Sequence, residues 1–211
     1  MRGLFITLEG GEGVGKSTQL IWLQEQLLQM GLTVRSTREP GGSNLGQKLR
    51  DIVLNDPMAP STELLIYLAD RMQHVHEKLS PWVQEKQVIL CDRFIDSSEV
   101  YQGVSRGLGQ QLVRQLHELL LPANLWPKLT ILLDMPPEEG LKRVNLRANK
   151  NDRLENELID FHQKVRQGFL DQAAGESERI KIVNALGSLP EVNSRVWQEA
   201  LPVVQAWQRE A

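Results

Sequence analysis

Short apolar runs and longer amphipathic segments alternate along the whole chain. Five runs of apolar or β-branched residues, each bounded by polar or glycine-containing segments, are typical of strands buried in a parallel sheet. They occupy residues 4–8, 33–37, 88–92, 129–134 and 180–184. Between them, apolar residues recur at spacings of three and four, which predicts helices. The pattern therefore predicts an α/β fold.

The predicted helices differ in length and in the residues that they bury. The first contains Leu20, Leu23, Leu27 and Leu28, and a second, short one carries Leu45 to Val53. A long helix is expected over 61–79, with a buried face of Leu64, Leu65, Leu68, Met72, Val75 and Leu79. Further helices are expected to end near Leu121, to begin near Pro136, to cover 155–173 and to include 192–207, while the glycine-bearing segment 96–109 is expected to be a loop. Strands alternating with helices predict a five-stranded parallel sheet with helices on both faces.

Charge and composition argue against several classes of protein. The net charge is −3 and the sequence pI is about 5.9, which argues against general binding to nucleic acid or to an anionic membrane. No apolar stretch approaches the ~20 residues that a membrane span needs. The single cysteine, Cys91, has no partner for an internal disulfide, and the first strand begins too early for a signal peptide. We expect a cytoplasmic protein without nucleic-acid or membrane partners.

The first strand leads into a phosphate-binding motif. Residues 10–17 read Gly-Gly-Glu-Gly-Val-Gly-Lys-Ser, which fits the P-loop pattern G-x-x-x-x-G-K-[ST] between a strand and a helix. Its glycines allow a tight turn with inward N–H groups, and the helix N-terminus adds partial positive charge. Lys16 is expected to reach the β and γ phosphates, and Ser17 to ligate Mg²⁺. The triphosphate of ATP is expected to bind Gly10, Gly11, Glu12, Gly13, Val14, Gly15, Lys16, Ser17 and Thr18.

A carboxylate at the end of a later strand supports this expectation. Asp92 closes the third apolar run and resembles the Walker-B aspartate that holds or orients Mg²⁺. The metal is therefore expected at Ser17 and Asp92. Residues 149–152 spell N-K-x-D, a guanine-reading pattern of GTPases, but a basic helical segment precedes them where a strand is required. We interpret that match as a coincidence.

Three further motifs, in order after the P-loop, carry a resemblance to a known family. They are Arg38-Glu39-Pro40-Gly41-Gly42, Asp92-Arg93-Phe94 and Tyr101-Gln102-Gly103. Together they resemble the thymidylate kinases, of bacterial type, over essentially the whole chain. The resemblance implies a single P-loop kinase domain over 1–211 with the nucleoside monophosphate kinase architecture. It implies phosphoryl transfer from ATP to dTMP, giving ADP and dTDP, with Mg²⁺ and as a homodimer.

The resemblance also implies roles for individual residues. Arg50 and Arg93 match positions that grip the acceptor phosphate, and Tyr67 stands where the family commonly places a phenylalanine against thymine. Arg71 and Gln102 match residues that contact the base, and Ser98 a small polar residue near sugar and base. The dTMP-binding set is Glu12, Glu39, Arg50, Tyr67, Arg71, Arg93, Ser98 and Gln102, with Glu12 at the deoxyribose 3′-hydroxyl. The catalytic set is Lys16, Arg93, Arg147, Arg153 and Glu12.

A helical lid is expected at about 143–155. The variable P-loop positions hold no basic residue, so charge on the transferring phosphoryl group has to be met from elsewhere. Arg143 and Arg147 share a helix face by their spacing of four. Arg147 and Arg153 resemble the lid arginines of the bacterial subgroup, and the lid is expected to close on ATP and deliver Arg153. The alternative is a solvated basic helix face.

Other functions stay open at this point. The same scaffold serves kinases for other nucleotides, and one methyl group distinguishes dUMP from dTMP by only ~1–3 kcal/mol in an apolar pocket. A P-loop switch or partitioning ATPase that binds a protein partner is a second alternative. A nucleotide-binding subunit without catalysis is a third, although Lys16, Ser17 and Asp92 argue against it.

Overall fold

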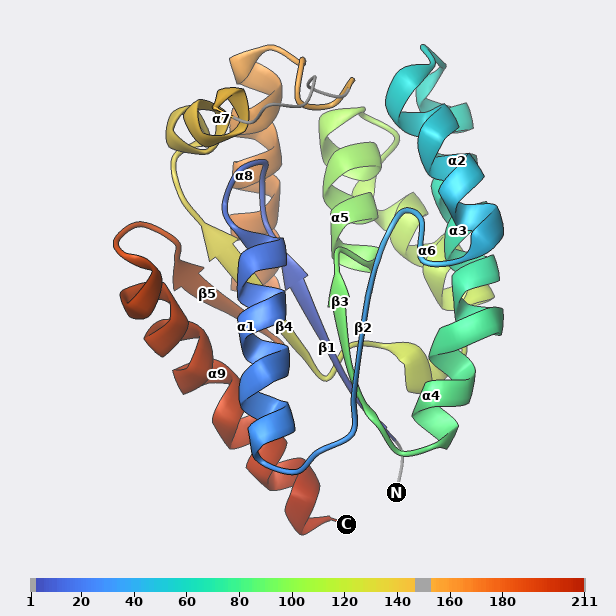
Figure 1. Ribbon diagram of the computed structural model, residues 1–211. Helices are drawn as coiled ribbons and strands as arrows, with labels where there is room; N and C mark the ends of the chain where they lie inside the picture. Colours follow the sequence, from blue (N-terminus) through green and yellow to red (C-terminus); the bar gives the residue numbers. More distant parts are fainter. Residues whose placement is uncertain (1–2, 147–152, 211) are drawn as a thin grey trace.

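A five-stranded parallel sheet lies at the centre of the fold. The computed structural model describes residues 3–146 and 153–210 (Figure 1). The strands are β1 (Leu4–Glu9), β2 (Val34–Arg38), β3 (Val88–Asp92), β4 (Leu129–Asp134) and β5 (Ile180–Asn184). Their order is β2-β3-β1-β4-β5, and all neighbouring pairs are parallel. The predicted five-stranded α/β sheet is confirmed.

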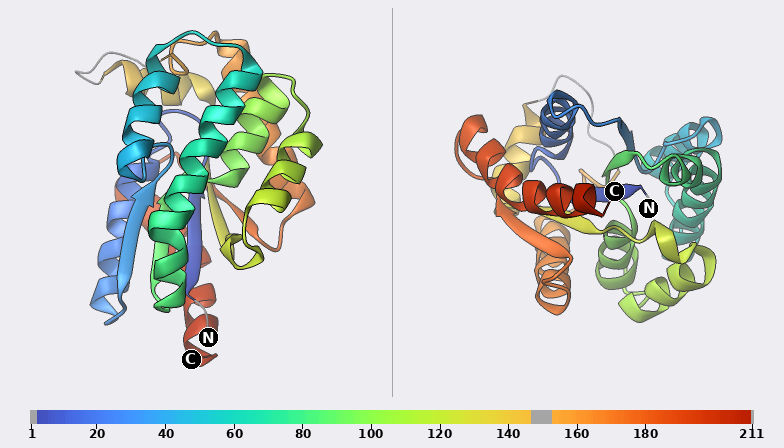
Figure 2. Two further views of the ribbon diagram at one scale, coloured as in Figure 1. Left: turned by 90° about the vertical axis from the view of Figure 1, so that its right-hand side faces the viewer. Right: turned by 90° about the horizontal axis from the view of Figure 1, so that it is seen from below.

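The central strand explains why the sequence shows continuous apolar runs. All six residues of β1 are buried, and its side chains alternate between two helical layers. Leu4, Ile6 and Leu8 contribute to a core with α1 (Lys16–Gln29) and α9 (Leu189–Arg209). Phe5 contributes to a different core on the opposite face. Viewed from below, α1 and α9 lie on one side of the sheet, and α5 and α8 lie on the other (Figure 2).

Most of the remaining helices pack against the second face of the sheet or against one another. They are α2 (Asn44–Asn55), α3 (Pro60–His74), α4 (Ser80–Gln84), α5 (Ile95–Ser98), α6 (Gln110–Leu120) and α8 (Ile159–Gly175). A π-helix (Val75–Leu79) joins α3 to α4, a 3₁₀ helix (Ala123–Leu125) precedes β4, and α7 (Pro137–Asn145) follows β4. None of the helices in residues 3–146 and 153–210 is long and apolar enough to cross a membrane.

Two local expectations were wrong. Segment 96–109 is mostly helical, because α5 continues into a π-helix (Glu99–Ser105) whose Val100 and Tyr101 are buried. Its Gly103 breaks no helix. A Cβ there would lie 2.8 Å from the Cα of Gln110, so glycine permits close packing against α6. Leu65 on α3 was expected to be buried, but it is 63% exposed.

The carboxyl ends of the strands bring the sequence motifs together. The register pairs Leu8 on β1 and Arg38 on β2 with Asp92 on β3. The P-loop, the Glu39–Gly42 turn and the Arg93 turn therefore leave the sheet at adjacent points on one edge. This is the edge at which open parallel sheets bind ligands.

Candidate active site

The P-loop connects β1 to α1 in the conformation that its glycines permit. Gly10, Gly13 and Gly15 all have positive φ angles. A Cβ on Gly13 would overlap the backbone of Gly140 on α7, so only glycine fits there. Lys16, at the start of α1, donates from Nζ to the carbonyl oxygens of Gly10 (3.1 Å) and Gly11 (2.6 Å). Its burial and the neighbouring Arg93 lower the pKa of Lys16 to about 8.

Two oxygen ligands suited to Mg²⁺ lie side by side at this loop. The Ser17 hydroxyl donates to Oδ2 of Asp92 at 2.7 Å, across the gap between α1 and the end of β3. Mg²⁺ prefers oxygen donors and is commonly held by few protein groups together with substrate phosphates. MgATP chemistry therefore fits the pair. The described residues contain no cluster of three or more histidine, cysteine or acidic side chains that could hold a metal by themselves.

Arg93 joins β3 to the P-loop through an unusual backbone conformation. Its φ is 68°, in the left-handed region that non-glycine residues rarely adopt. Nη1 donates to the Gly10 carbonyl at 2.9 Å and Nη2 to Oε1 of Glu12 at 2.7 Å. The guanidinium also lies 5.0 Å from the ring centroid of Tyr101. Nη1 also donates to the Ser97 hydroxyl at 3.2 Å, so four partners fix the position of the guanidinium.

Glu12 is held as an anion beside the phosphate-binding loop. It accepts hydrogen bonds from Arg93 and from the Tyr101 hydroxyl at 2.7 Å. Burial alone would raise the pKa of Glu12, but the charges of Arg93 and Lys16 outweigh it and lower the pKa to about 2. A permanently ionised carboxylate can accept a hydrogen bond from a substrate hydroxyl but cannot donate one.

A second carboxylate stabilises the turn at Arg93 through the residues that follow it. Glu9, the last residue of β1, accepts from the Phe94 backbone N–H (2.7 Å) and from the Ser97 hydroxyl (2.5 Å). Its complete burial and the proximity of Asp96 raise the pKa of Glu9 to about 8. Glu9 could not be selected from its sequence context, because its partners lie far along the chain.

Arg71 on α3 is held by four acceptors. Nε donates to Oε2 of Glu39 (2.7 Å), Nη1 to Ser98 (3.0 Å) and to Nε2 of His117 (2.6 Å), and Nη2 to the Phe94 carbonyl (3.0 Å). Because an arginine only donates, His117 accepts here, and burial and the charge of Arg71 lower its pKa to about 2. A guanidinium has five N–H groups. One N–H on Nη2 therefore has no acceptor among the described residues.

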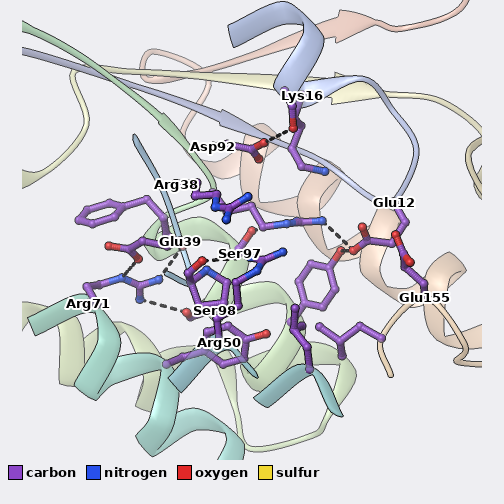
Figure 3. A pocket seen from close by; sticks show the side chains of 18 of the residues that line it. Glu12, Lys16, Arg38, Glu39, Arg50, Arg71, Asp92, Ser97, Ser98 and Glu155 are labelled. Atoms are coloured by element: carbon purple, nitrogen blue, oxygen red, sulfur yellow. Dashed lines mark hydrogen bonds and ion pairs between the residues drawn. The ribbon is translucent and has the colours of Figure 1, made fainter. Parts of the chain in front are cut away.

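One cavity of about 230 Å³ connects these groups. In Figure 3, Lys16, Arg38, Arg50 and Arg71 come from different elements and surround the same pocket. Arg50 donates to the Pro40 carbonyl at 3.0 Å. The lining also includes Glu12, Gly13, Gly15, Ser17, Thr18, Glu39, Tyr67, Asp92, Arg93, Ser98 and Gln102. Every predicted dTMP-binding residue thus contacts this cavity, and so do Lys16 and both predicted metal ligands.

The predicted lid at 143–155 contributes Leu154 and Glu155 to the lining of this cavity, whereas Arg153 does not line it. Arg153 donates to Oε2 of Glu63 (2.5 Å) and to the Val53 carbonyl (3.0 Å), so it contacts α2 and α3 instead of the P-loop. Arg147 and the motif at 149–152 lie outside the described residues. The proposed action of both arginines on the phosphoryl group stays a prediction.

Several lining residues were not selected from the sequence. Tyr101 was part of a quoted motif but received no role, and it binds Glu12. Arg38 and Ser97 also line the cavity, together with Leu154 and Glu155 from the start of the segment before α8. Arg38 had a usable signal, because it stands at the carboxyl end of β2 in the Arg38–Gly42 motif. The others depend on tertiary packing.

Comparison with known proteins identifies the family. The family model for thymidylate kinase matches residues 8–196. A thymidylate kinase from a Synechococcus species is 49% identical, covering 94% of this chain and 95% of that one. One from Desulfosudis oleivorans is 46% identical over 92% of this chain and 94% of its own. A crystal structure of thymidylate kinase from Ehrlichia chaffeensis superposes with a TM-score of 0.76, 29% identity, and coverage of 96% and 98%. The chain belongs to the thymidylate kinase family.

Proposed function

We propose that this protein transfers the γ-phosphoryl group of ATP to dTMP, giving ADP and dTDP. The observation that carries the proposal is the single cavity that joins the P-loop lysine to an arginine- and tyrosine-lined pocket. Family membership supports the same reaction. The comparisons give no support to a switch or partitioning ATPase.

The acceptor in this reaction is a phosphate, which is already an anion at neutral pH. No general base is needed, so the main task is to hold two polyanions together and offset their repulsion. Lys16 would bind the donor phosphates, while Arg50 and Arg93 would bind the acceptor phosphate with their planar guanidinium groups. Arg38 points into the same cavity and would add positive charge there.

Ser17 and Asp92 would hold Mg²⁺. When bound, the ion supplies positive charge between the donor phosphates and limits their repulsion. The 2.7 Å contact between the Ser17 hydroxyl and Asp92 places both oxygens where one cation could bind them.

The remaining lining residues suit a deoxynucleoside monophosphate. The ring of Tyr67 would stack on the base, and the N–H of Arg71 that has no acceptor among the described residues would donate to it. Gln102 and Ser98 would contact its edge, Glu39 would hold Arg71, and Glu12 would accept from the 3′-hydroxyl. Glu12 is ionised, so it can accept a hydrogen bond from that hydroxyl. A carboxylate without such a partner would only be repelled by the nearby phosphates.

The assembly is proposed to be a homodimer. Large apolar side chains are exposed on α2, α3 and α6, among them Ile52, Leu65 and Leu112. These helices are candidates for the subunit interface, and exposed apolar surface is typical of such contacts. The cytoplasmic location and the absence of a nucleic-acid partner stay predictions from composition.

The substrate class can be tested with the purified protein and MgATP. ADP release should be fast with dTMP, slower but measurable with dUMP, and near background with dCMP, dGMP and UMP. A P-loop switch would instead hydrolyse ATP at the same rate with or without an acceptor. No conversion of dTMP in this assay would overturn the proposed function.

The lid proposal makes a separate prediction for Arg153. Delivery of Arg153 to the triphosphate requires its ion pair with Glu63 to open. We expect Arg153→Ala to lower kcat by about 10- to 100-fold, less than the full contribution of an arginine in other P-loop enzymes because Arg147 remains. The KM for dTMP should change by much less. An unchanged kcat together with a raised KM for dTMP would show that Arg153 only forms the ion pair with Glu63 and does not act on the transferred phosphoryl group.

A further inference from the structure

Glu63, on the first turn of α3, is a buried carboxylate to which the proposed reaction assigns no role. Its side chain is 1% exposed and accepts from three donors. These are Nε2 of Gln102 (2.8 Å), Nε of Arg106 (3.3 Å) and Nη2 of Arg153 (2.5 Å). We propose that Glu63 is a positioning residue that fixes the orientation of the Gln102 amide, and thereby selects pyrimidine bases that carry a proton on N3. The inference rests on the proposed function and deepens it.

The orientation of the amide follows from the chemistry of its partner. An ionised carboxylate only accepts hydrogen bonds, whereas an amide has one donating and one accepting end. The end of Gln102 that contacts Glu63 is therefore the NH₂ group. Gln102 is 1% exposed and lines the cavity, and its Oε1 has no donor among the described residues. Oε1 is thus the end of the amide that is available to a ligand.

The neighbouring arginine has a fixed polarity as well. Arg71 uses four N–H groups on Glu39, Ser98, His117 and Phe94, and it can offer the cavity only a donor. Arg71 and Gln102 together present one donor and one acceptor to the edge of a base. Thymine and uracil match this pair, since O4 accepts and N3–H donates. Cytosine has the opposite polarity at both positions, because its 4-amino group donates and its N3 accepts.

Glu63 is needed for this polarity because a glutamine in its place could donate or accept. In the Glu63→Gln variant, either end of the Gln102 amide could find a partner at residue 63. The amide would then be free to turn its NH₂ group toward N3 of cytosine. The site rejects cytosine by leaving its polar groups unpaired. This discrimination is lost when the Gln102 amide can rotate to pair with either base.

The test measures kcat/KM for dTMP, dUMP and dCMP in the wild type and in Glu63→Gln. We expect kcat/KM for dTMP and dUMP to fall together by roughly 10-fold or more, while kcat/KM for dCMP stays constant or rises. The ratio of dTMP to dUMP should stay constant, since both bases carry the N3 proton.

Glu157→Gln is the matched control. Glu157 binds Arg106 at 2.7 Å, as Glu63 does at 3.3 Å, but Glu63 is the carboxylate that accepts from Gln102. This variant removes the charge of one Arg106 partner and should keep the wild-type preference for dTMP over dCMP. Thermal unfolding of all variants shows whether they are folded.

A second variant keeps the proposal testable if Glu63→Gln does not fold. Gln102→Leu retains Glu63 with its two arginines and removes both ends of the amide. It should lower kcat/KM for dTMP and dUMP but not for dCMP. Equal losses for dTMP and dCMP in either variant would overturn the role of Glu63. A wild type that does not phosphorylate dTMP would instead overturn the proposed function, so the two failures can be distinguished.

Discussion

Replacing Lys16 by methionine is expected to lower kcat by roughly 10³-fold or more. Methionine has a similar length but no charge, so the change removes the P-loop cation that is proposed to bind the donor phosphates. Positioned cations contribute on this scale in P-loop phosphoryl transfer, because catalysis there consists mainly of positioning and charge neutralisation. Lys16 is suited to this role. Burial and Arg93 lower its pKa to about 8, which still leaves most of it protonated at neutral pH.

The measurement is the steady-state kcat at saturating dTMP and MgATP. Lys142→Met is the control, because Lys142 lies on α7 with its side chain 69% exposed and forms an ion pair with the exposed Glu139. That variant should keep the wild-type kcat. A Lys16→Met enzyme that is folded and retains a tenth or more of the wild-type kcat would contradict the assigned role.

The sheet could be predicted because its strands are buried on both faces. β1 is buried throughout, so its sequence shows an unbroken apolar run that periodicity analysis recognises. Helix faces were less certain, since a leucine fits several positions on an amphipathic helix. Leu65 follows the buried Leu64 on α3 but points to solvent. Segment 96–109 was misjudged because glycines suggest a loop, whereas Gly103 serves helix packing.

The site was predictable where its geometry is local. The P-loop is one short segment between a strand and a helix, so its sequence determines its shape. The Ser17–Asp92 contact also followed, because Asp92 ends a strand that neighbours β1. Motif resemblance then supplied the residues predicted to bind the acceptor, and all of them line the cavity.

Supporting groups could not be predicted in the same way. Glu9 binds Ser97, and Glu63 binds Gln102, across long stretches of chain and with buried side chains. A single sequence gives no sign that a glutamate on a helix faces inward. The position of Arg153 depends on tertiary contacts too, since it bonds Val53 and Glu63 on α2 and α3.

The strained backbone at Arg93 leads to the second prediction. A left-handed conformation costs a non-glycine residue roughly 1–2 kcal/mol. The φ of Arg93 is 68°, and this conformation directs its guanidinium to Gly10 and Glu12. Stability alone would favour glycine at this position. The arginine is therefore expected to be required for activity.

We expect Arg93→Ala and Arg93→Gly both to lower kcat/KM for dTMP by about 10²- to 10³-fold, since each removes the guanidinium proposed to bind the acceptor phosphate. The two variants should differ in stability. Arg93→Gly should unfold at a higher urea concentration than Arg93→Ala, by a free-energy difference of about 1 kcal/mol, because glycine adopts the left-handed conformation without strain.

Arg93→Lys separates charge from geometry. It restores the positive charge but cannot reach Gly10 and Glu12 at the same time in the way that the planar fork does, so it should recover only a small part of the activity. The measurements are kcat/KM for dTMP and urea unfolding of all three variants. An Arg93→Gly enzyme with nearly wild-type kcat/KM would show that Arg93 only braces the loop. Equal stability of the alanine and glycine variants would show that the positive φ stores no strain.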